Sequence, residues 1–482
     1  MTAVRTNILR KKGKIVIDRQ SELTLEQQIY RQIRQMILSG GLSSGYKLPS
    51  TRKLAAELKI SRNTVIAAYS QLIAEGYLET FKGAGTVVAD GLHALDIIPS
   101  FKQSQPEPER RNTAAKKQID FRTGMPALEY FPHKEWGNLY REVCNTIPPS
   151  SYGYCRTAGV WELRESIARH LYRTRGLSCN PKQIVITSGA TQGLSLISHL
   201  LKEKQKTVLI EEPTHAGLRE VITLAGCCIE GIQVDKNGLC TELLQGKKNI
   251  SFIYTTPSHQ YPIGGVLPIQ RRLELIRYAE QNDCYIVKDD YDGEFRYEEQ
   301  PVSSLYELSP QRVIYLGSFS KILSPALRLG FMILPEKLLH PCKKLKMYSD
   351  VHTDALSQHT LAKFMQAGSL EKHIWKMKKL YSRKRSLLLN ELARHFPHEF
   401  RILGQATGLH IIVQFQNLIF TEETEKILQD KGVRIYRTEA FYLNKSLFHN
   451  NEIIMGYSHL SAEEIVKGID IISNHFSSLI FY

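Results

Sequence analysis

The segment RVIYLGSFSKILSPALRLG, residues 312–330, carries most of the information about the fold of this chain. Its first half is rich in β-branched and aromatic residues, which predicts a strand buried on both faces. Lys321 follows, between Ser318 and Ser320 on one side and Arg328 on the other. A lysine that forms a Schiff base must lose its proton part of the time, and hydroxyls with an arginine can hold a phosphate. A single lysine after a strand usually lies on the surface, so the prediction of a covalent anchor depends on these neighbours.

Short apolar runs of the same kind recur upstream, separated by stretches of helix length. They are residues 182–187, 207–212, 250–257 and 284–291. Strand-sized runs that alternate with helix-sized segments predict a mostly parallel sheet with helices on both faces. We therefore expect residues 119–482 to form one α/β domain.

The run at 284–291 ends in carboxylates, in the sequence CYIVKDDY. Pyridoxal 5'-phosphate (PLP) needs a carboxylate against its pyridine nitrogen, because protonation there makes the ring an electron sink. We assign Asp289 to the pyridinium and Tyr291 to the ring hydroxyl. An exposed acidic turn or a divalent-metal site are the alternatives, but converging metal ligands are not visible in the sequence, so we predict no metal.

Two further turns extend this candidate site. Ala190 and Thr191 open a helix after the run at 182–187, and the free amides of a helix N-terminus bind phosphate. His215 follows the run at 207–212 and is expected to lie against the face of the PLP ring. The alternative for His215 is an exposed loop position. We place Ser318, Ser320 and Arg328 at the phosphate.

Residues 20–90 have a different pattern, which predicts a second domain. Apolar residues at helical spacing predict a helix over residues 25–38. Ser50 and Ser61 each precede a further short helix and are suited to cap it. Val65, Leu72 and Ile73 of the second helix are expected to face the core. Two short helices joined by a tight turn form a helix-turn-helix, whose second helix begins at the base edges of DNA. The residues at that place are Arg62, Asn63 and Thr64.

Residues 77–89, YLETFKGAGTVVA, predict a hairpin after the second of these helices. Its tip contains Lys82, Gly83 and Gly85, and a glycine-rich tip with a lysine can approach phosphates closely. The alternative is a small helical bundle with solvated arginines. The capped helices, the hairpin and the local charge together favour a winged helix-turn-helix that binds DNA.

The charge is concentrated in the same region. The chain has a formal net charge of +15, and residues 1–90 hold fourteen lysines and arginines against seven acidic residues. Such a local excess favours a nucleic-acid partner over general basicity. Residues 91–118 are polar, charged and contain proline, which is typical of a linker.

The eight cysteines are scattered without zinc-finger spacing, and we interpret them as reduced thiols. The basic N-terminus is not followed by an apolar segment, and no apolar run approaches transmembrane length. These features predict a cytoplasmic protein without a membrane partner.

Residues 48–78, LPSTRKLAAELKISRNTVIAAYSQLIAEGYL, and the GAGT that begins at Gly83 resemble the winged helix of the GntR family. The resemblance implies that DNA is contacted by Arg52, Arg62, Asn63, Thr64 and the hairpin tip. The four segments from 188 to 330 resemble, in this order, those of fold-type I PLP enzymes. The whole chain resembles the MocR/GabR regulators, which implies an aminotransferase-like effector domain and a head-to-tail homodimer.

Three positions depart from the aminotransferase pattern. His215 stands where an aromatic residue, often Tyr, is common, and Tyr261 stands where aminotransferases supply an Asn to the ring hydroxyl. Near the C-terminus, residues 451–461 contain His459 but no arginine to grip a substrate carboxylate. Arg437 is the alternative source of such a cation. PLP binding is compatible with these changes, whereas efficient amino-acid turnover is not expected.

Three functions therefore compete. The first is a PLP-dependent DNA-binding regulator that senses an amine, an amino acid or PLP itself. The second is a working aminotransferase with an accessory DNA-binding domain, against which the helix-turn-helix pattern argues. The third is a DNA-binding protein whose effector domain has lost its cofactor, against which the set of Lys321, Asp289 and Arg328 argues. We favour the first.

Overall fold

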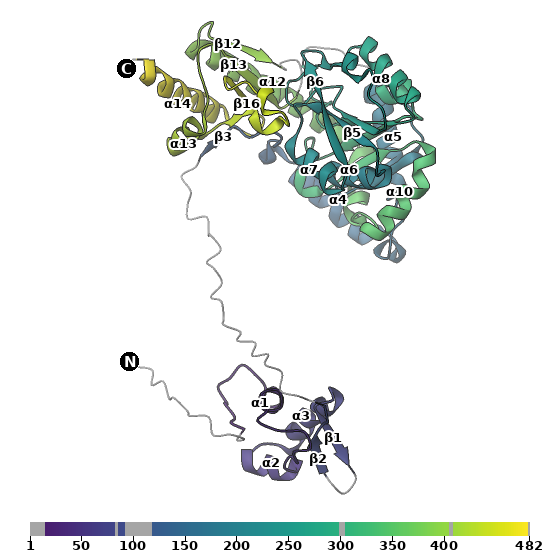
Figure 1. The fold of residues 1–482 in the computed structure, drawn as a ribbon, viewed down its shortest axis with the longest axis vertical. Coiled ribbons are helices and arrows are strands. Elements are labelled where there is room, and N and C mark those ends of the chain that lie inside the picture. Colours follow the sequence, from purple (N-terminus) through teal and green to yellow (C-terminus); the bar gives the residue numbers. More distant parts are fainter. Residues whose placement is uncertain (1–14, 82–84, 92–117, 298–303, 404–407, 481–482) are drawn as a thin grey trace. The chain divides into compact units, whose positions relative to one another are not determined.

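Figure 1 shows the computed structural model, which describes residues 15–81, 85–91, 118–297, 304–403 and 408–480. The chain divides into two units, residues 1–113 and 114–482. Most of the expected linker at 91–118, together with Lys82 and Gly83 of the expected hairpin tip, lies outside the described residues. The two units are described in turn.

The N-terminal unit is a winged helix. It consists of α1 (Leu25–Leu38), α2 (Thr51–Leu58), α3 (Arg62–Ala74) and the antiparallel strands β1 (Leu78–Phe81) and β2 (Gly85–Val88). The side chains of Ser50 and Ser61 accept hydrogen bonds from the first turns of α2 and α3, as the sequence predicts. Ile33, Val65 and Leu72 belong to a core shared by the three helices and the hairpin. Ile73, which was expected to face this core, is 38% exposed instead.

The segment before α2 joins the hairpin as a third, very short strand. Lys47 forms an isolated antiparallel bridge with Val87, and the amide of Leu48 donates to the carbonyl of Thr86 over 2.9 Å. The hairpin is therefore fastened to the start of the helix-turn-helix by backbone hydrogen bonds, which side-chain substitutions leave in place.

The C-terminal unit is built on an eight-stranded sheet in the order β4-β11-β10-β9-β8-β5-β6-β7. The strands are β4 (Ile184–Thr187), β5 (Thr207–Glu212), β6 (Cys228–Asp235), β7 (Gly238–Leu239), β8 (Ile250–Thr255), β9 (Tyr285–Asp290), β10 (Val313–Ser318) and β11 (Gly330–Ile333). The pairs from β10 to β6 are parallel, whereas β11 and β7 run antiparallel to their neighbours. The prediction of a mostly parallel sheet is confirmed.

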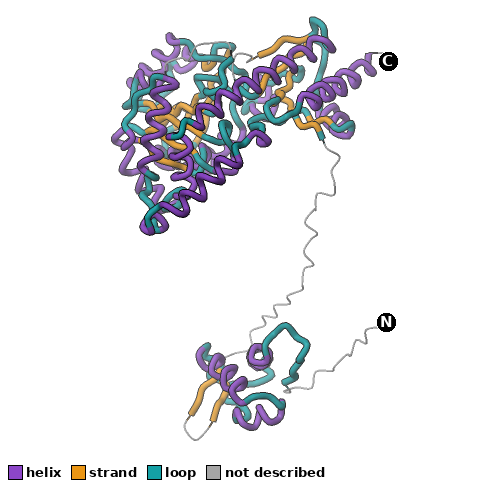
Figure 2. The backbone as a smooth tube through the Cα atoms, turned by 180° about the vertical axis from the view of Figure 1, so that it is seen from behind, coloured by secondary structure: helices purple, strands orange, loops and turns teal. Residues whose placement is uncertain are grey.

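Helices cover both faces of this sheet, because each face carries its own apolar cluster (Figure 2). One cluster takes residues from α6 (Ala190–Leu201), α7 (Ala216–Leu224) and α10 (Glu336–Ser349). The other takes residues from α4 (His133–Thr146), α5 (Trp161–Arg175), α8 (Ile269–Gln281), α9 (Leu305–Leu308) and α11 (Ala355–Gln366). Every residue of β4, β8 and β10 is buried, and these strands are mostly apolar.

A smaller layer completes the C-terminal unit. Its four-stranded antiparallel sheet has the order β12-β13-β16-β15, from β12 (Phe400–Leu403), β13 (His410–Phe415), β16 (Glu452–Gly456) and β15 (Tyr436–Arg437). The helices α12 (Ser369–His395), α13 (Glu422–Asp430) and α14 (Ala462–Ile480) accompany it, and β3 (Ile119–Asp120) pairs with β14 (Val433–Arg434). The segment that follows β3 runs from this layer to the cavity at the large sheet.

Within the described part of the chain, no helix is long and apolar enough to cross a membrane. The same residues contain no cluster of His, Cys, Asp or Glu side chains arranged to hold a metal ion.

Candidate functional site

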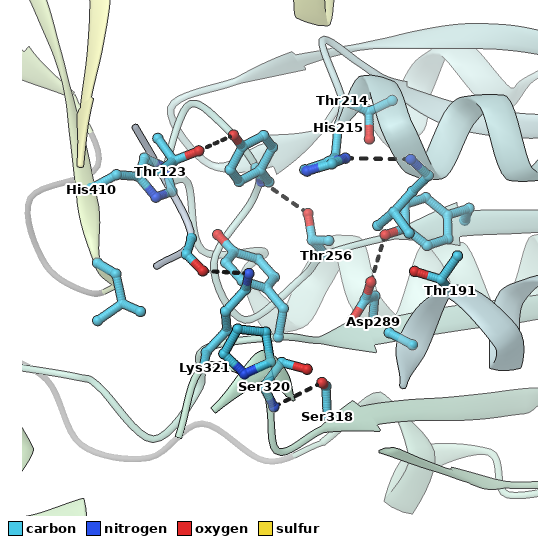
Figure 3. A pocket seen from close by; sticks show the side chains of 18 of the residues that line it. Thr123, Thr191, Thr214, His215, Thr256, Asp289, Ser318, Ser320, Lys321 and His410 are labelled. Atoms are coloured by element: carbon cyan, nitrogen blue, oxygen red, sulfur yellow. Dashed lines mark hydrogen bonds between the residues drawn. The ribbon is translucent and has the colours of Figure 1, made fainter. Parts of the chain in front are cut away.

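A cavity of about 260 Å³ lies at the carboxyl ends of the parallel strands (Figure 3). This is the edge at which open α/β sheets bind their ligands. All of the residues that the sequence assigns to the cofactor line this one cavity: Ala190, Thr191, His215, Asp289, Tyr291, Ser318, Ser320, Lys321 and Arg328. They lie at or after the carboxyl ends of four strands, β4, β5, β9 and β10, so the fold brings together residues that are up to 138 positions apart.

Lys321 follows β10 and points into the cavity (Figure 3). Its Nζ donates a hydrogen bond of 2.6 Å to the carbonyl of Gly124, on the segment after β3. Burial lowers the pKa of Lys321, against the opposing charges of Asp292 and Asp289. A lowered pKa makes the neutral, nucleophilic amine more available.

Asp289 is the next-to-last residue of β9 and is 2% exposed. Its Oδ2 accepts a hydrogen bond of 2.7 Å from the hydroxyl of Tyr254, while its buried Oδ1 has no hydrogen-bond partner among the described residues. Burial raises the pKa of Asp289 to about 7, although the bond from Tyr254 opposes the rise. A buried carboxylate oxygen without a partner costs free energy unless a ligand supplies a donor.

The turn before α6 and the first residues of that helix form another side of the cavity. Gly189 has φ 90° and caps α6 without a side-chain hydrogen bond, so the amides of the first turn are available to an anion. A Cβ atom at Gly189 would lie 3.3 Å from the guanidinium of Arg328. Nη2 of Arg328 donates to the carbonyl of Ser188 over 2.6 Å. Glycine is therefore required here both for its backbone angle and for the close approach of Arg328.

Aromatic side chains form the remaining wall. The ring centroid of His215 lies 5.2 Å from that of Tyr261, and Nδ1 of His215 accepts a hydrogen bond from the amide of Leu218. His215 is therefore fixed as the N-cap of α7, with its ring on the cavity. The hydroxyl of Tyr291 lies 2.9 Å from Nδ1 of His259, a partner that the sequence did not suggest.

Several residues of the cavity were not predicted from the sequence. They include Thr123, Gly124, Tyr254, Thr256 and His410. Tyr254 lies inside a continuously apolar strand, where its position indicates core packing, and Thr123 precedes Lys321 by almost two hundred residues. Only Tyr261 was noted, as a departure from the aminotransferase pattern, and its hydroxyl lies 2.9 Å from that of Thr123.

Neither candidate for a substrate carboxylate anchor lines the cavity. Nε2 of His459 lies 2.8 Å from the carbonyl of Asp120. Arg437 is surrounded by Glu422, Glu425 and Glu439. Among the described residues that line the cavity, the only lysine and arginine are Lys321 and Arg328.

The predicted DNA contacts in the N-terminal unit lie at the first turn of α3 and on α2. Arg52, Arg62 and Asn63 are exposed, Thr64 is half-buried, and Gly85 is exposed where β2 begins. The Nε atom of Arg62 lies 3.4 Å from Oγ1 of Thr51 on α2. Exposed cationic and amide groups at the start of this helix can meet base edges and phosphates.

Two family models match the chain. Residues 25–88 match the bacterial regulatory proteins of the gntR family, and residues 130–455 match the class I and II aminotransferases. The latter match spans more than half of the chain.

Curated relatives align over almost the whole of this chain. The HTH-type pyridoxine biosynthesis transcriptional regulator PdxR of Corynebacterium glutamicum is 32% identical over 92% of this chain and 94% of its own. The probable rhizopine catabolism regulatory protein MocR of Rhizobium meliloti is 29% identical over 96% of both chains. The chain belongs to the MocR/GabR family of transcriptional regulators.

Solved structures show the same fold for the effector unit of this MocR-type regulator. An archaeal alanine:glyoxylate aminotransferase aligns with a TM-score of 0.70 and 28% identity, over 76% of this chain and 92% of its own. The regulator is thus a GntR-type winged helix joined to a fold-type I aminotransferase domain.

Proposed function

We propose that this MocR-type regulator binds PLP at Lys321 and uses the occupancy of that site to control its binding to operator DNA. The proposal rests on one cavity. The amine of Lys321, the buried carboxylate of Asp289 and the turn before α6, which can bind an anion, all line it. We propose residues 20–90 as the DNA-binding domain, 91–118 as the linker and 119–482 as the effector domain.

The donors and acceptors of the cavity fit PLP. Oδ1 of Asp289 would accept a hydrogen bond from the protonated pyridine nitrogen, which removes the cost of its burial. The first turn of α6, Arg328, Ser318 and Ser320 would hold the phosphate. His215 and Tyr291 would contact the ring and its hydroxyl. PLP supplies an aldehyde that binds amines covalently, and an electron sink.

The residues of this chain provide a route by which the site can report its state. When the amine of Lys321 is free, its Nζ donates to the carbonyl of Gly124, as seen here. When that amine is engaged by a cofactor, this hydrogen bond is given up. Gly124 follows β3, the first strand after the proposed linker, so the state of Lys321 bears on the segment that enters the effector domain. A change of partner at one hydrogen bond can bias a two-state element.

The effector is proposed to be an amine, an amino acid or PLP itself, and turnover of amino acids to be poor. Transamination needs a substrate held so that its α-proton faces a base, and a bidentate arginine holds a carboxylate best. Lys321 and Arg328, the only lysine and arginine among the described lining residues, are both assigned to the cofactor. The second candidate, a working aminotransferase, is favoured by the completeness of the cofactor set.

We propose that a homodimer reads a two-part operator through Arg52, Arg62, Asn63, Thr64 and the wing with Lys82, Gly83 and Gly85. Symmetric dimers of helix-turn-helix proteins bind paired half-sites. A footprint limited to one short half-site would contradict dimeric binding.

One experiment tests regulation and catalysis together. The full-length protein is loaded with PLP and mixed with a panel of amines and amino acids, and operator binding and oxoacid formation are followed in parallel. We expect operator affinity to change with PLP or an effector. The amount of oxoacid formed should stay well below one equivalent per protein chain. Steady turnover at about 1 per second or faster would establish the aminotransferase instead.

A further inference from the structure

Lys346 is a fully buried lysine on α10, with 0% of its side chain exposed. Its Nζ donates to both carboxylate oxygens of Asp350, at 2.8 and 2.7 Å, and lies 3.2 Å from Oγ1 of Thr353. It also lies 3.4 Å from Oε1 of Gln192, in the first turn of α6. One of the acceptors around this buried cation, Gln192, thus belongs to the turn that opens α6.

Gln192 carries the connection further. Its Nε2 donates to Asp350 over 2.7 Å, and its Oε1 accepts a hydrogen bond of 2.7 Å from the amide of Ser188. The carbonyl of Ser188 in turn accepts the bond from Nη2 of Arg328. A continuous hydrogen-bonded path therefore runs from Lys346 through Gln192 and Ser188 to the guanidinium at the cavity.

The corner after α10 is held against the backbone preference of its own residues. Val351, directly after Asp350, has φ 62°. A β-branched residue in this left-handed region costs free energy and persists only where its surroundings fix it. Oγ1 of Thr353 also donates to the carbonyl of Ile186 in β4, which ties the corner to the strand that leads into the turn.

We propose that Lys346 is a positioning residue. Together with Asp350 and Gln192 it fixes the turn at Ser188–Thr191 and the side chain of Arg328. This triad makes the cavity select the phosphorylated form of its cofactor. The inference rests on the proposed function, because it assigns the phosphate to this turn. The residues proposed to contact the PLP ring are Asp289, His215 and Tyr291. They are not members of the hydrogen-bonded path through the triad.

A merely structural role for Lys346 predicts a different result. Loss of a buried ion pair would then loosen the whole effector unit and weaken PLP and its unphosphorylated analogue pyridoxal alike. A positioning role predicts a loss that is specific to the phosphate. The ratio of the two affinities therefore separates the roles.

The test uses the full-length, cofactor-free protein, with PLP and pyridoxal titrated separately and binding measured by equilibrium dialysis. Lys346→Met is expected to weaken PLP binding about tenfold or more, as for the loss of hydrogen bonds to a charged group, and to change pyridoxal binding less than about twofold. Lys384→Met is the matched control. Lys384 is also a buried lysine, and it donates to the carbonyl of Ser458 in the smaller layer. The control is expected to leave the affinity ratio unchanged.

Breaking a buried pair can prevent folding, so Gln192→Met provides a second variant that keeps Lys346 and Asp350 together. It is expected to lower the preference for PLP in the same direction. If the ratio of the PLP and pyridoxal affinities is unchanged in both variants, the inference is overturned and the proposed function stays intact. Equal losses for the two compounds would be one such result. Failure of the wild type to prefer PLP over pyridoxal would overturn both.

Discussion

Asp289 is a buried carboxyl group whose ionisation the protein around it disfavours. Burial raises the pKa of Asp289 to about 7, from the ordinary 3.8 that applies to the unfolded chain. Between these values the unfolded chain releases the proton while the folded chain keeps it. Stability of the cofactor-free protein should therefore fall as the pH rises from about 4 to about 7, and stay low above that.

Asp289→Asn should remove this cost, because an amide does not ionise and its oxygen can still accept the bond from Tyr254. We expect the cofactor-free variant to exceed the wild type by roughly 2–4 kcal/mol at pH 8 and to match it at pH 4, measured by urea unfolding. The same variant should bind PLP more weakly, since the partner of the pyridine nitrogen is lost. Equal stability at pH 8 would show that the carboxylate is not held in a dry site.

Lys321 is expected to be the residue that binds PLP covalently. Borohydride reduction of the PLP-loaded protein, followed by peptide mapping, should place the label on Lys321, and Lys321→Ala should abolish labelling. The chain contains an internal control in Lys288, whose pKa is lowered to about 8 by burial but which donates to Asp290 and Ser304 and does not line the cavity. A label on Lys288 would show that a low pKa, and not position, decides reactivity.

At the scale of the helix and the turn, the start of α3 should decide operator recognition. Asn63→Ala is expected to cost about 1–3 kcal/mol in operator affinity and to relax specificity at one position, as for the loss of a base-reading side chain. The measurement is fluorescence anisotropy with an operator selected from a random pool.

A control variant lies outside the N-terminal unit. Arg169→Ala removes an exposed arginine of the C-terminal unit, which lies 3.8 Å from Glu165, and should leave operator binding unchanged. If Asn63→Ala weakens all sequences to the same extent, Asn63 serves affinity and not specificity.

The corner at Val351 offers a test of backbone strain. Val351→Gly should relieve the cost of φ 62° and raise the free energy of unfolding by up to about 1 kcal/mol, whereas Val351→Ala, which keeps the Cβ atom, should gain less. Urea unfolding of the two variants measures the difference. A loss of stability with glycine would mean that packing of the valine side chain outweighs the strain.

Sequence patterns predicted the elements better than the contacts between them. The capped helices α2 and α3 and the parallel strands follow from periodicity and from local hydrogen bonds, which a few residues determine. Polar cavity residues after β4, β9 and β10 were identified, because such residues have few other reasons to recur at these junctions, whereas Thr256, which directly follows β8, was missed. Gly124, Thr123 and Tyr254 were missed because their roles arise from distant segments that only the folded chain brings together. Ile73 was misplaced because helical spacing alone does not show where a packed face ends.

At the scale of the whole molecule, the two units have separate apolar cores. We expect scanning calorimetry of the full-length protein to show two transitions, of which saturating PLP raises only that of the effector unit. At a free concentration one hundred times the dissociation constant, the gain is about 2.7 kcal/mol. A shift of both transitions would indicate that the units unfold together.

The unpartnered oxygen of Asp289 also bears on how long the protein survives in a cell. A chain without cofactor would unfold more often than a loaded chain, and proteases act on the unfolded fraction. A difference of 1–2 kcal/mol in stability can change the abundance of a protein several-fold. The supply of vitamin B6 would then set the number of regulator molecules as well as the fraction that is loaded with PLP. A cell starved of the vitamin would lower the abundance of the regulator by degradation, without any change in its synthesis.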